Sequence, residues 1–502
     1  MYLWLSGYNM SCIRSVFEAL KFSCETGIHL WNHHLLSFAA CAALSDGDID
    51  TATGFLRKIE ASLPHARKID KVFYHFLCAW RDLTAGNLSS AEEHIKISDN
   101  LAAKIGAYFP IAVNYVTSAH IYSEKGEYRE AITWLNRAQQ MGRRTKSRLI
   151  KYMCLLTNAW FALEHGGKNV SEKETLDALR KAMSFGREHR FINSFLWRPE
   201  VVSRLCVKAL EAEIETEYVR QLICARKLVP DTPPLECENW PWPLKIYTMG
   251  RFALLKEDCP VSTSGKVQRK PLEIIKALVS SGSRDVSTDR VTNMLWPDAE
   301  GDMAHHAFES ALYRLRRLIG NDVAIRLQGG HLSLDSRRCW VDVWAFEKLL
   351  EEIAEVSVSE KSDACFRADL LRRIENAFHL YKGSFLPDDA SCLWTAPIRK
   401  SLQKKFFRLV MLSGNYLERV KQWQKAVEYY ERAIEADTLA EEFYQRLMLC
   451  HHRLGRRLEA VKTYHDLRDV LSSVYRITPS PETEAIYRYI LSEQNKPEGR
   501  PG

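Results

Sequence analysis

The stretch from residue 287 to residue 334 constrains the fold most, because it holds two helix patterns and a hairpin in a fixed order. A short helix can open at Ser287 or Thr288 and must stop at Trp296-Pro297, since proline cannot continue a helix. A longer helix follows over residues 304 to 319, and Gly329-Gly330 then joins two short alternating runs. This order predicts a helix that reads DNA, followed by a β wing.

The predicted helix over residues 304 to 319 has two unlike faces. Apolar side chains recur at i, i+4, i+7 and i+11 and must face a core: Phe308, Leu312, Leu315 and Ile319. The opposite face is polar and cationic and carries His306, Ser310, Tyr313, Arg314 and Arg317, with Glu309 and Arg316 on its flanks. Such side chains donate to phosphates, and arginine is the best bidentate partner of guanine. An ordinary amphipathic surface helix is the alternative, and the neighbouring segments favour DNA binding.

The segments around this helix complete a winged helix-turn-helix. Leu244–Leu255 alternates and turns at Gly250, as a small antiparallel sheet would, and a helix is expected from about Pro271 to Ser280 with Pro271 at its first position. Through Leu295-Trp296, Leu315–Leu318 and Gly329–Leu332, the chain resembles the OmpR-type winged-helix family.

That resemblance implies that the 304 to 319 helix enters the major groove. It also implies that the hairpin of residues 326 to 334 touches an adjacent backbone or minor groove, which adds Arg326 and His331 to the candidate DNA contacts. The family usually has an aromatic residue where this chain has His331.

Residues 340 to 490 resemble the bacterial transcriptional activation domain of the antibiotic-pathway regulator family. The matching segments are, in order, Trp340–Glu347, Tyr381–Pro387, Asp437–Tyr444 and Thr478–Thr483. The resemblance implies a helical repeat unit packed against the DNA-binding module, dimerisation, binding to direct repeats and contact with RNA polymerase.

The same region has an internal repeat. Its members are 34 residues apart, as Ala426, Tyr430 and Ala433 recur as Ala460, Tyr464 and Leu467. This is the tetratricopeptide period, in which a small residue lets two helices approach and an aromatic side chain fills the next gap.

Residues 1 to 229 are predicted to form a second helical array. Gly47, Gly86 and Gly126 each begin a turn that leads into an amphipathic helix, and the alanines five residues later are 39 and 40 residues apart (52 to 91, 91 to 131). The pattern resembles the helical solenoid of MalT-like regulators, in which the solenoid receives the inducer signal. Gly166-Gly167 with Leu176–Ala178 is expected to be a fourth, degenerate copy.

A proline-rich linker separates the two arrays. Residues 230 to 243 hold five prolines in fourteen residues, which excludes a helix or a central strand, and Trp240 and Trp242 are expected to dock onto a neighbouring domain. The predicted domains are therefore a solenoid (1–229), a linker (230–243), a winged helix (244–339) and an activation domain (340–495).

Charge and composition fit a protein of the cytoplasm that binds DNA with a focused surface. Residues 244 to 345 hold 15 Lys and Arg against 12 Asp and Glu, a net charge of +3. A further run, Arg137–Lys151, holds six cations and no acid, and solvated helix faces are the preferred interpretation over contact with DNA. The 13 cysteines are predicted to be reduced, and no apolar run approaches the ~20 residues of a membrane helix.

No catalytic, cofactor or metal site is predicted. Ser264-Gly265-Lys266 resembles the end of a phosphate-binding loop, but Pro260 stands where the loop needs glycine and Val267 where it needs Ser or Thr. The adjacent histidine pairs, such as His305-His306, diverge on a helix and make poor metal sites.

The sequence thus predicts a mainly α-helical protein: an α-solenoid, a central winged helix-turn-helix (α+β) and a C-terminal tetratricopeptide-like domain. The protein is predicted to be a DNA-binding transcriptional regulator that acts as an activator, and not an enzyme.

The expected partners are double-stranded promoter DNA, RNA polymerase, a second copy on direct repeats, and a small-molecule or protein inducer at the solenoid. No association with a membrane is expected. The competing hypothesis is a helical-repeat scaffold that keeps the winged helix only for packing. Large MalT-like regulators carry a nucleotide-binding domain upstream. The chain is therefore expected to be either the C-terminal half of a longer regulator of this kind or a shortened relative.

Overall fold

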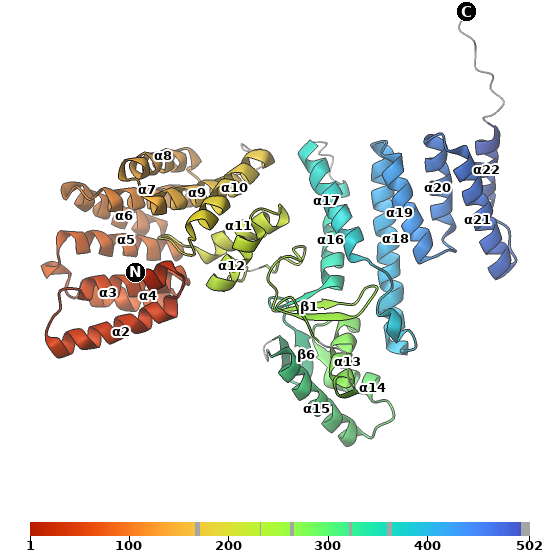
Figure 1. Ribbon diagram of the computed structural model, residues 1–502, viewed down its shortest axis with the longest axis horizontal. Coiled ribbons are helices and arrows are strands. Elements are labelled where there is room, and N and C mark those ends of the chain that lie inside the picture. The colour runs from red at the N-terminus through yellow and green to blue at the C-terminus, as the bar shows by residue number, and fades with distance from the viewer. Residues whose placement is uncertain (166–170, 231, 262–265, 321–323, 359–363, 493–502) are drawn as a thin grey trace, which may run out of the picture. The chain divides into compact units, whose positions relative to one another are not determined.

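The computed structural model describes residues 1–165, 171–230, 232–261, 266–320, 324–358 and 364–492 (Figure 1). It divides into two compact units, Met1–Pro241 and Trp242–Gly502. The first unit is helical, and the second combines two small sheets with helices. The predicted fold class, a mainly α-helical chain with an α-solenoid and a central winged helix, is therefore confirmed.

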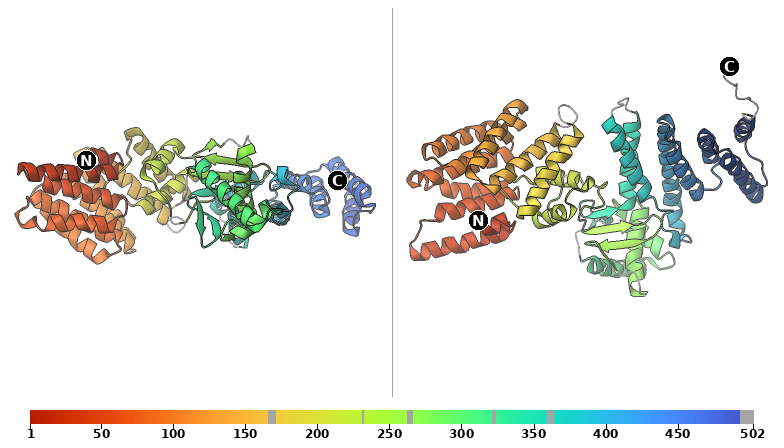
Figure 2. Two further views of the ribbon diagram at one scale, coloured as in Figure 1. Left: turned by 90° about the horizontal axis from the view of Figure 1, so that it is seen from below. Right: turned by 45° about the horizontal axis from the view of Figure 1, so that its top comes forward.

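The first unit is a stack of helical hairpins (Figure 2), in which α3 packs on α4, α5 on α6, α7 on α8 and α9 on α10. Its helices are α1 (Tyr2–Leu5), α2 (Asn9–Thr26), α3 (Asn32–Ser45), α4 (Ile49–Glu60), α5 (Lys68–Thr84), α6 (Leu88–Lys104), α7 (Tyr108–Glu124), α8 (Tyr128–Thr145), α9 (Arg148–Glu164), α10 (Glu172–His189), α11 (Pro199–Glu211) and α12 (Thr216–Arg226), with a 3-10 turn at Leu63–His65.

The three glycine turns predicted in this unit connect the two helices of a hairpin. Gly47, Gly86 and Gly126 all have positive φ, between 76° and 80°, which only glycine adopts freely. The alanines that follow, at positions 52, 91 and 131, are fully buried, so each lets its helix approach its neighbour closely. Of the predicted fourth copy, Gly166-Gly167 lies outside the described residues, and Ala178 is buried in α10.

The second unit begins with the strands and helices of the winged helix. These are β1 (Leu244–Tyr247), β2 (Ala253–Lys256), β3 (Cys259–Pro260), α13 (Lys266–Ser280), β4 (Val286–Ser287), α14 (Thr288–Leu295), α15 (Gly301–Ile319), β5 (Ile325–Gln328), β6 (His331–Leu334) and β7 (Cys339–Val341). One sheet has the order β3-β2-β1-β7 and the other β4-β6-β5. The predicted hairpin of β1 and β2 is antiparallel, whereas β7 adds to β1 in parallel.

Helix α13 differs from its prediction. It begins at Lys266, so Pro271 lies inside the helix and is not its first residue. A proline within a helix removes one backbone hydrogen bond. The buried face of this helix, with Leu272, Ile275 and Leu278 at most 4% exposed, compensates for that loss through tertiary packing.

The remaining helices of the second unit continue from the sheet. They are α16 (Asp342–Val358), α17 (Ala364–Leu380), α18 (Ala396–Arg419), α19 (Trp423–Ala436), α20 (Glu441–Arg453), α21 (Arg457–Tyr475) and α22 (Pro481–Ser492), with 3-10 turns at Pro387–Asp389 and Leu393–Thr395. The six residues of the predicted 34-residue repeat lie in α19 and α21, and all six are buried.

The close packing around Ala460 gives a testable consequence of this repeat. Ala460 is fully buried and clusters with Met448, Tyr464 and Ile490. We expect Ala460→Leu to overpack this cluster and lower the free energy of unfolding by about 1–3 kcal/mol, measured by urea denaturation. Leu458→Ala is the control, because Leu458 is 83% exposed and its removal should change stability little. Equal stabilities of the two variants would contradict the repeat register.

Helices long and apolar enough to cross a membrane do not occur among the described residues. Over the same part of the chain, no group of three or more potential metal ligands comes together. The twelve cysteines whose side chains are described form no disulfide bond.

Candidate nucleic-acid interface

Helices α14 and α15 form the predicted helix-turn-helix. The Ser287 hydroxyl accepts a hydrogen bond from the Arg290 amide at 3.2 Å and so caps the start of α14. The helix stops at Leu295, before Trp296-Pro297. In α15 the whole predicted apolar stripe is at most 4% exposed. Ala304 and Ala311 are buried beside this stripe, although the predicted stripe contained only large apolar side chains.

The opposite face of α15 points to solvent. His306, Ser310, Tyr313, Arg314 and Arg317 are all exposed, and Tyr313 is 68% exposed. Arg314 donates to the Ser310 hydroxyl at 2.9 Å, one helical turn away. The structure brings these five predicted side chains onto one continuous surface, which is called the outer face of α15 below.

Two further residues near the start of α15 also reach the solvent and were not among the predicted DNA contacts. Met303 is 63% exposed, and the exposed His305 places its Nε2 atom 3.4 Å from Glu309. His306 approaches the same carboxylate, with its Nδ1 atom at 3.8 Å. The predicted helix began at residue 304, so it contained His305 but not Met303, whereas α15 begins at Gly301. Glu309 is an acid on the flank of a cationic surface and opposes phosphate binding there.

Arg316 differs from the other candidates. It is half-buried and donates to the Ile325 carbonyl at 3.1 Å, while its Nε atom is buried and has no partner among the described residues. This side chain connects α15 to β5. Its position is that of a packing residue, so it is left out of the interface proposed below.

The wing is the β5–β6 hairpin. Gly329 and Gly330 turn it with φ of 55° and 76°, the left-handed backbone that a two-residue hairpin turn requires. The Thr288 amide donates to the Gly330 carbonyl at 2.9 Å, so the tip of the hairpin is attached to the start of α14.

The two wing candidates have partners in the wing itself. Arg326 forms an ion pair with Asp335 although its side chain is 60% exposed. The exposed His331 has its Nδ1 atom 3.0 Å from the Gly329 carbonyl. Since Asp335 neutralises Arg326, the wing offers less positive charge than the outer face of α15.

A buried carboxylate joins this module to the helices that follow. Asp342, at the start of α16, accepts hydrogen bonds from the amides of Thr248 and Met249 at 2.6 and 2.8 Å and from the Thr248 hydroxyl at 2.8 Å. Burial raises the pKa of the Asp342 carboxyl to about 6, although these donors favour its charged form.

The turn after β1 is held from its other side as well. The Gly250 amide donates to the Ser384 carbonyl at 3.0 Å, and the Leu386 amide donates to the Thr248 carbonyl at 2.8 Å. A Cβ atom at Gly250 would lie 2.6 Å from the Lys382 carbonyl oxygen, which leaves room only for glycine. The turn of residues 248–250 is therefore enclosed by residues from both ends of the α16–α17 hairpin.

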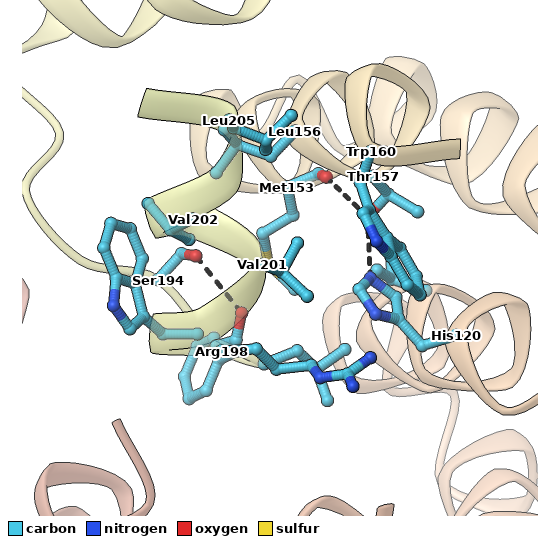
Figure 3. A pocket seen from close by; sticks show the side chains of 14 residues that line it. His120, Met153, Leu156, Thr157, Trp160, Ser194, Arg198, Val201, Val202 and Leu205 are labelled. Carbon is cyan, nitrogen blue, oxygen red and sulfur yellow. Dashed lines mark hydrogen bonds between the residues drawn. The ribbon is translucent and has the colours of Figure 1, made fainter. Parts of the chain in front are cut away.

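The first unit has a small cavity beside His120, drawn in Figure 3. The Thr157 hydroxyl donates to the Met153 carbonyl at 2.9 Å and so accepts from His120 Nε2 at 2.9 Å. Burial lowers the pKa of the His120 imidazole to about 3, and the Arg198 charge adds to this effect. His120 is therefore neutral at pH 7. A cavity of about 30 Å³ holds a water molecule but not an inducer.

Comparisons with known proteins identify two parts of the chain. Residues 341–491 match the family model of the bacterial transcriptional activator domain, and residues 112–141, which cover most of α7 and α8, match a tetratricopeptide repeat. The regulatory protein AfsR of Streptomyces griseus is 22% identical over 236 residues, which is 46% of this chain and 23% of that protein. The chain thus spans about a quarter of the length of this relative.

Among solved structures, the chain is similar to Mycobacterium tuberculosis EmbR, solved in complex with a low-affinity phosphopeptide. The sequence identity is 18% and the TM-score 0.41, over 51% of this chain and 66% of that one. A TM-score of this size does not establish a shared fold. The family match and the relative together support the predicted activator domain: residues 341–491 are similar to the bacterial transcriptional activator domain, and the chain is similar in part to a bacterial regulatory protein.

Proposed function

We propose that this protein is a transcriptional activator that binds promoter DNA through the outer face of α15. The observation that carries the proposal is the exposure of Arg314, Arg317 and Tyr313 on one helix face, directly before a hairpin wing and an activator domain. A helix that serves only for packing has no need of exposed cations and an exposed aromatic ring together.

The geometry suggests how α15 would read a duplex. Arg314 and Arg317 are three residues apart, which separates their Cα atoms by about 4.5 Å along the helix axis. In the major groove, two arginines so spaced can contact neighbouring base pairs, or one base and one phosphate. This is the docking mode of the OmpR-type family that the sequence resembles. Arg326 and His331 would then contact the adjacent backbone through the wing.

The partners of the activator domain are part of the same proposal. The AfsR relative is named a regulatory protein, and the matched family is an activator domain, which supports contact with RNA polymerase. The enclosed turn of residues 248–250 fixes the activator helices against the sheet of the winged helix. A second copy on direct repeats would present two such modules in the same orientation.

Selection from a random duplex library tests DNA binding and finds the preferred duplex in the same experiment. The full chain should enrich a defined sequence motif, and its affinity for that duplex should fall steeply with salt because phosphate contacts release counterions. Enrichment of no motif, with equal affinity for all duplexes, would favour a scaffold that keeps the winged helix for packing.

The first unit is proposed to mask the DNA-binding surface until a signal binds. A proline-rich connection transmits a change of docking better than a flexible one. If masking costs about 2 kcal/mol, a chain that begins at Leu244 should bind the selected duplex roughly thirtyfold more tightly than the full chain. Fluorescence anisotropy measures both affinities. Equal affinity and equal promoter activation without any inducer would show that residues 1–243 are no autoinhibitor.

A further inference from the structure

A basic cavity lies in the first unit where the end of α8, the start of α9 and the end of α10 meet. Its volume is about 680 Å³, within the range of small-molecule binding sites. Four exposed cations line it: Arg143, Lys146, Arg148 and Lys151. Apolar atoms of Ile150, Leu155 and Phe185 line the same cavity.

The cations of this cavity have no acidic partners of their own. Within the described part of the chain, none of the four forms an ion pair. Among the described residues that line the cavity, Glu188 is the one acid, and it lies 3.8 Å from His189 Nε2. Four like charges around one hollow repel one another, and a bound anion would relieve that repulsion.

The structure divides the cationic run of residues 137 to 151 into two groups. Arg137 lies over the Trp134 ring at 4.6 Å, and Arg144 lies over the Tyr108 ring at 5.5 Å. The other four cations face the cavity. All six cations are exposed, as the interpretation of a solvated face expects, and four of them line one cavity beside the αL residue Lys146 that ends α8.

The backbone at the start of α9 adds to the positive potential. The Ser147 hydroxyl caps this 17-residue helix by accepting from the Ile150 amide at 3.3 Å. The amides of Arg148 and Leu149 belong to the first turn, which has no partners within a helix, and the helix dipole places partial positive charge there. Ser147 and Arg148 both line the cavity, so this helix end and the cations act on the same volume.

An aromatic side chain completes the site. Lys151 Nζ lies 4.5 Å from the centre of the Phe185 ring, and His189 meets that ring edge-on with centroids 4.3 Å apart. A ligand with an aromatic or apolar body can rest against Phe185 while its anionic end reaches the cations.

We propose that this cavity binds a small organic phosphate, with the phosphate on Arg143, Lys146 and Arg148 and the body of the ligand against Phe185. The proposal gives a chemical class to the signal that the first unit is proposed to sense. It rests on the cavity itself, and ligand binding stands whether or not the chain binds DNA.

Isothermal titration calorimetry on the full chain tests the site with three probes: ADP, pyrophosphate and adenosine. ADP should bind once per chain, pyrophosphate more weakly, and adenosine at least about tenfold more weakly than ADP, because charge-assisted hydrogen bonds are the strong ones. No binding of ADP or pyrophosphate at millimolar concentration would overturn the proposal.

A matched pair of charge reversals locates the site. Arg143→Glu with Arg148→Glu should lower the ADP affinity at least about tenfold. Lys104→Glu with Arg129→Glu changes the net charge equally at exposed positions outside the cavity and should change the affinity by less than about twofold. Equal losses in both variants would mean unspecific attraction and would overturn the assignment. DNA affinity is measured in a separate experiment. The absence of ADP binding can therefore be distinguished from the absence of DNA binding.

Discussion

Replacing both Arg314 and Arg317 with alanine is expected to lower the affinity for the selected duplex by about a hundredfold, since each well-placed arginine contributes roughly tenfold or more. Both side chains are exposed on the outer face of α15 and pair with no acid within the described residues, so their loss should leave the fold intact. Fluorescence anisotropy across a salt series measures the effect.

The single variants separate two kinds of contact. An arginine that reads a base should lose discrimination between the selected duplex and a mutated one, whereas an arginine on a phosphate should reduce the salt slope by about one unit. Arg488→Ala is the control, because Arg488 is an exposed cation in α22 and does not belong to α15 or the wing. Undiminished affinity in both single variants and in the double variant would refute the proposed interface.

Asp342→Ala is expected to destabilise the second unit by about 3 kcal/mol or more. The carboxylate accepts from the buried residues Thr248 and Met249 in the turn after β1, and its removal leaves these donors without partners. Each buried donor left unsatisfied costs roughly 1–3 kcal/mol. Urea denaturation measures the loss. Hydrogen exchange should also become faster at the Thr248 and Met249 amides in particular. A loss of stability elsewhere in the unit would not accelerate exchange at these two amides more than at others.

Asp388→Ala is the matched control, because Asp388 is an exposed carboxylate in the 3-10 turn that directly follows Leu386. Its replacement should change stability by less than about 0.5 kcal/mol. If Asp342→Ala unfolded at the same urea concentration as this control, the turn would be held by Ser384 and Leu386 alone. The carboxylate would then not be what fixes the activator helices to the winged helix.

The sequence predicted the helix-turn-helix because its signals are local. Ser287 caps α14, proline ends it, and the stripe of α15 follows directly from the helical period. The positive φ at Gly329 and Gly330 follows equally from the needs of a tight hairpin turn. The glycine turns and buried alanines of the helical arrays are confirmed for the same reason, since each depends on a few residues close together in the chain.

The sequence could not decide which cations of a pattern stay available. Arg316 and Arg317 are neighbours, but about 100° of helical rotation turns Arg316 toward the Ile325 carbonyl and Arg317 toward solvent. Arg326 is likewise neutralised by Asp335, across the hairpin. Whether a charge meets a partner depends on the strand that packs beside it, which no helical period encodes.

By itself the sequence determined the order of elements, the helix faces and the repeat spacing. Only the tertiary structure decided the rest: the short strands β3 and β7, the enclosure of the turn after β1 by Asp342, and the gathering of four cations around one cavity in the first unit. Strands of two or three residues are too short for alternation to reveal. Residues 94 positions apart, such as Thr248 and Asp342, meet only because the whole sheet has formed between them.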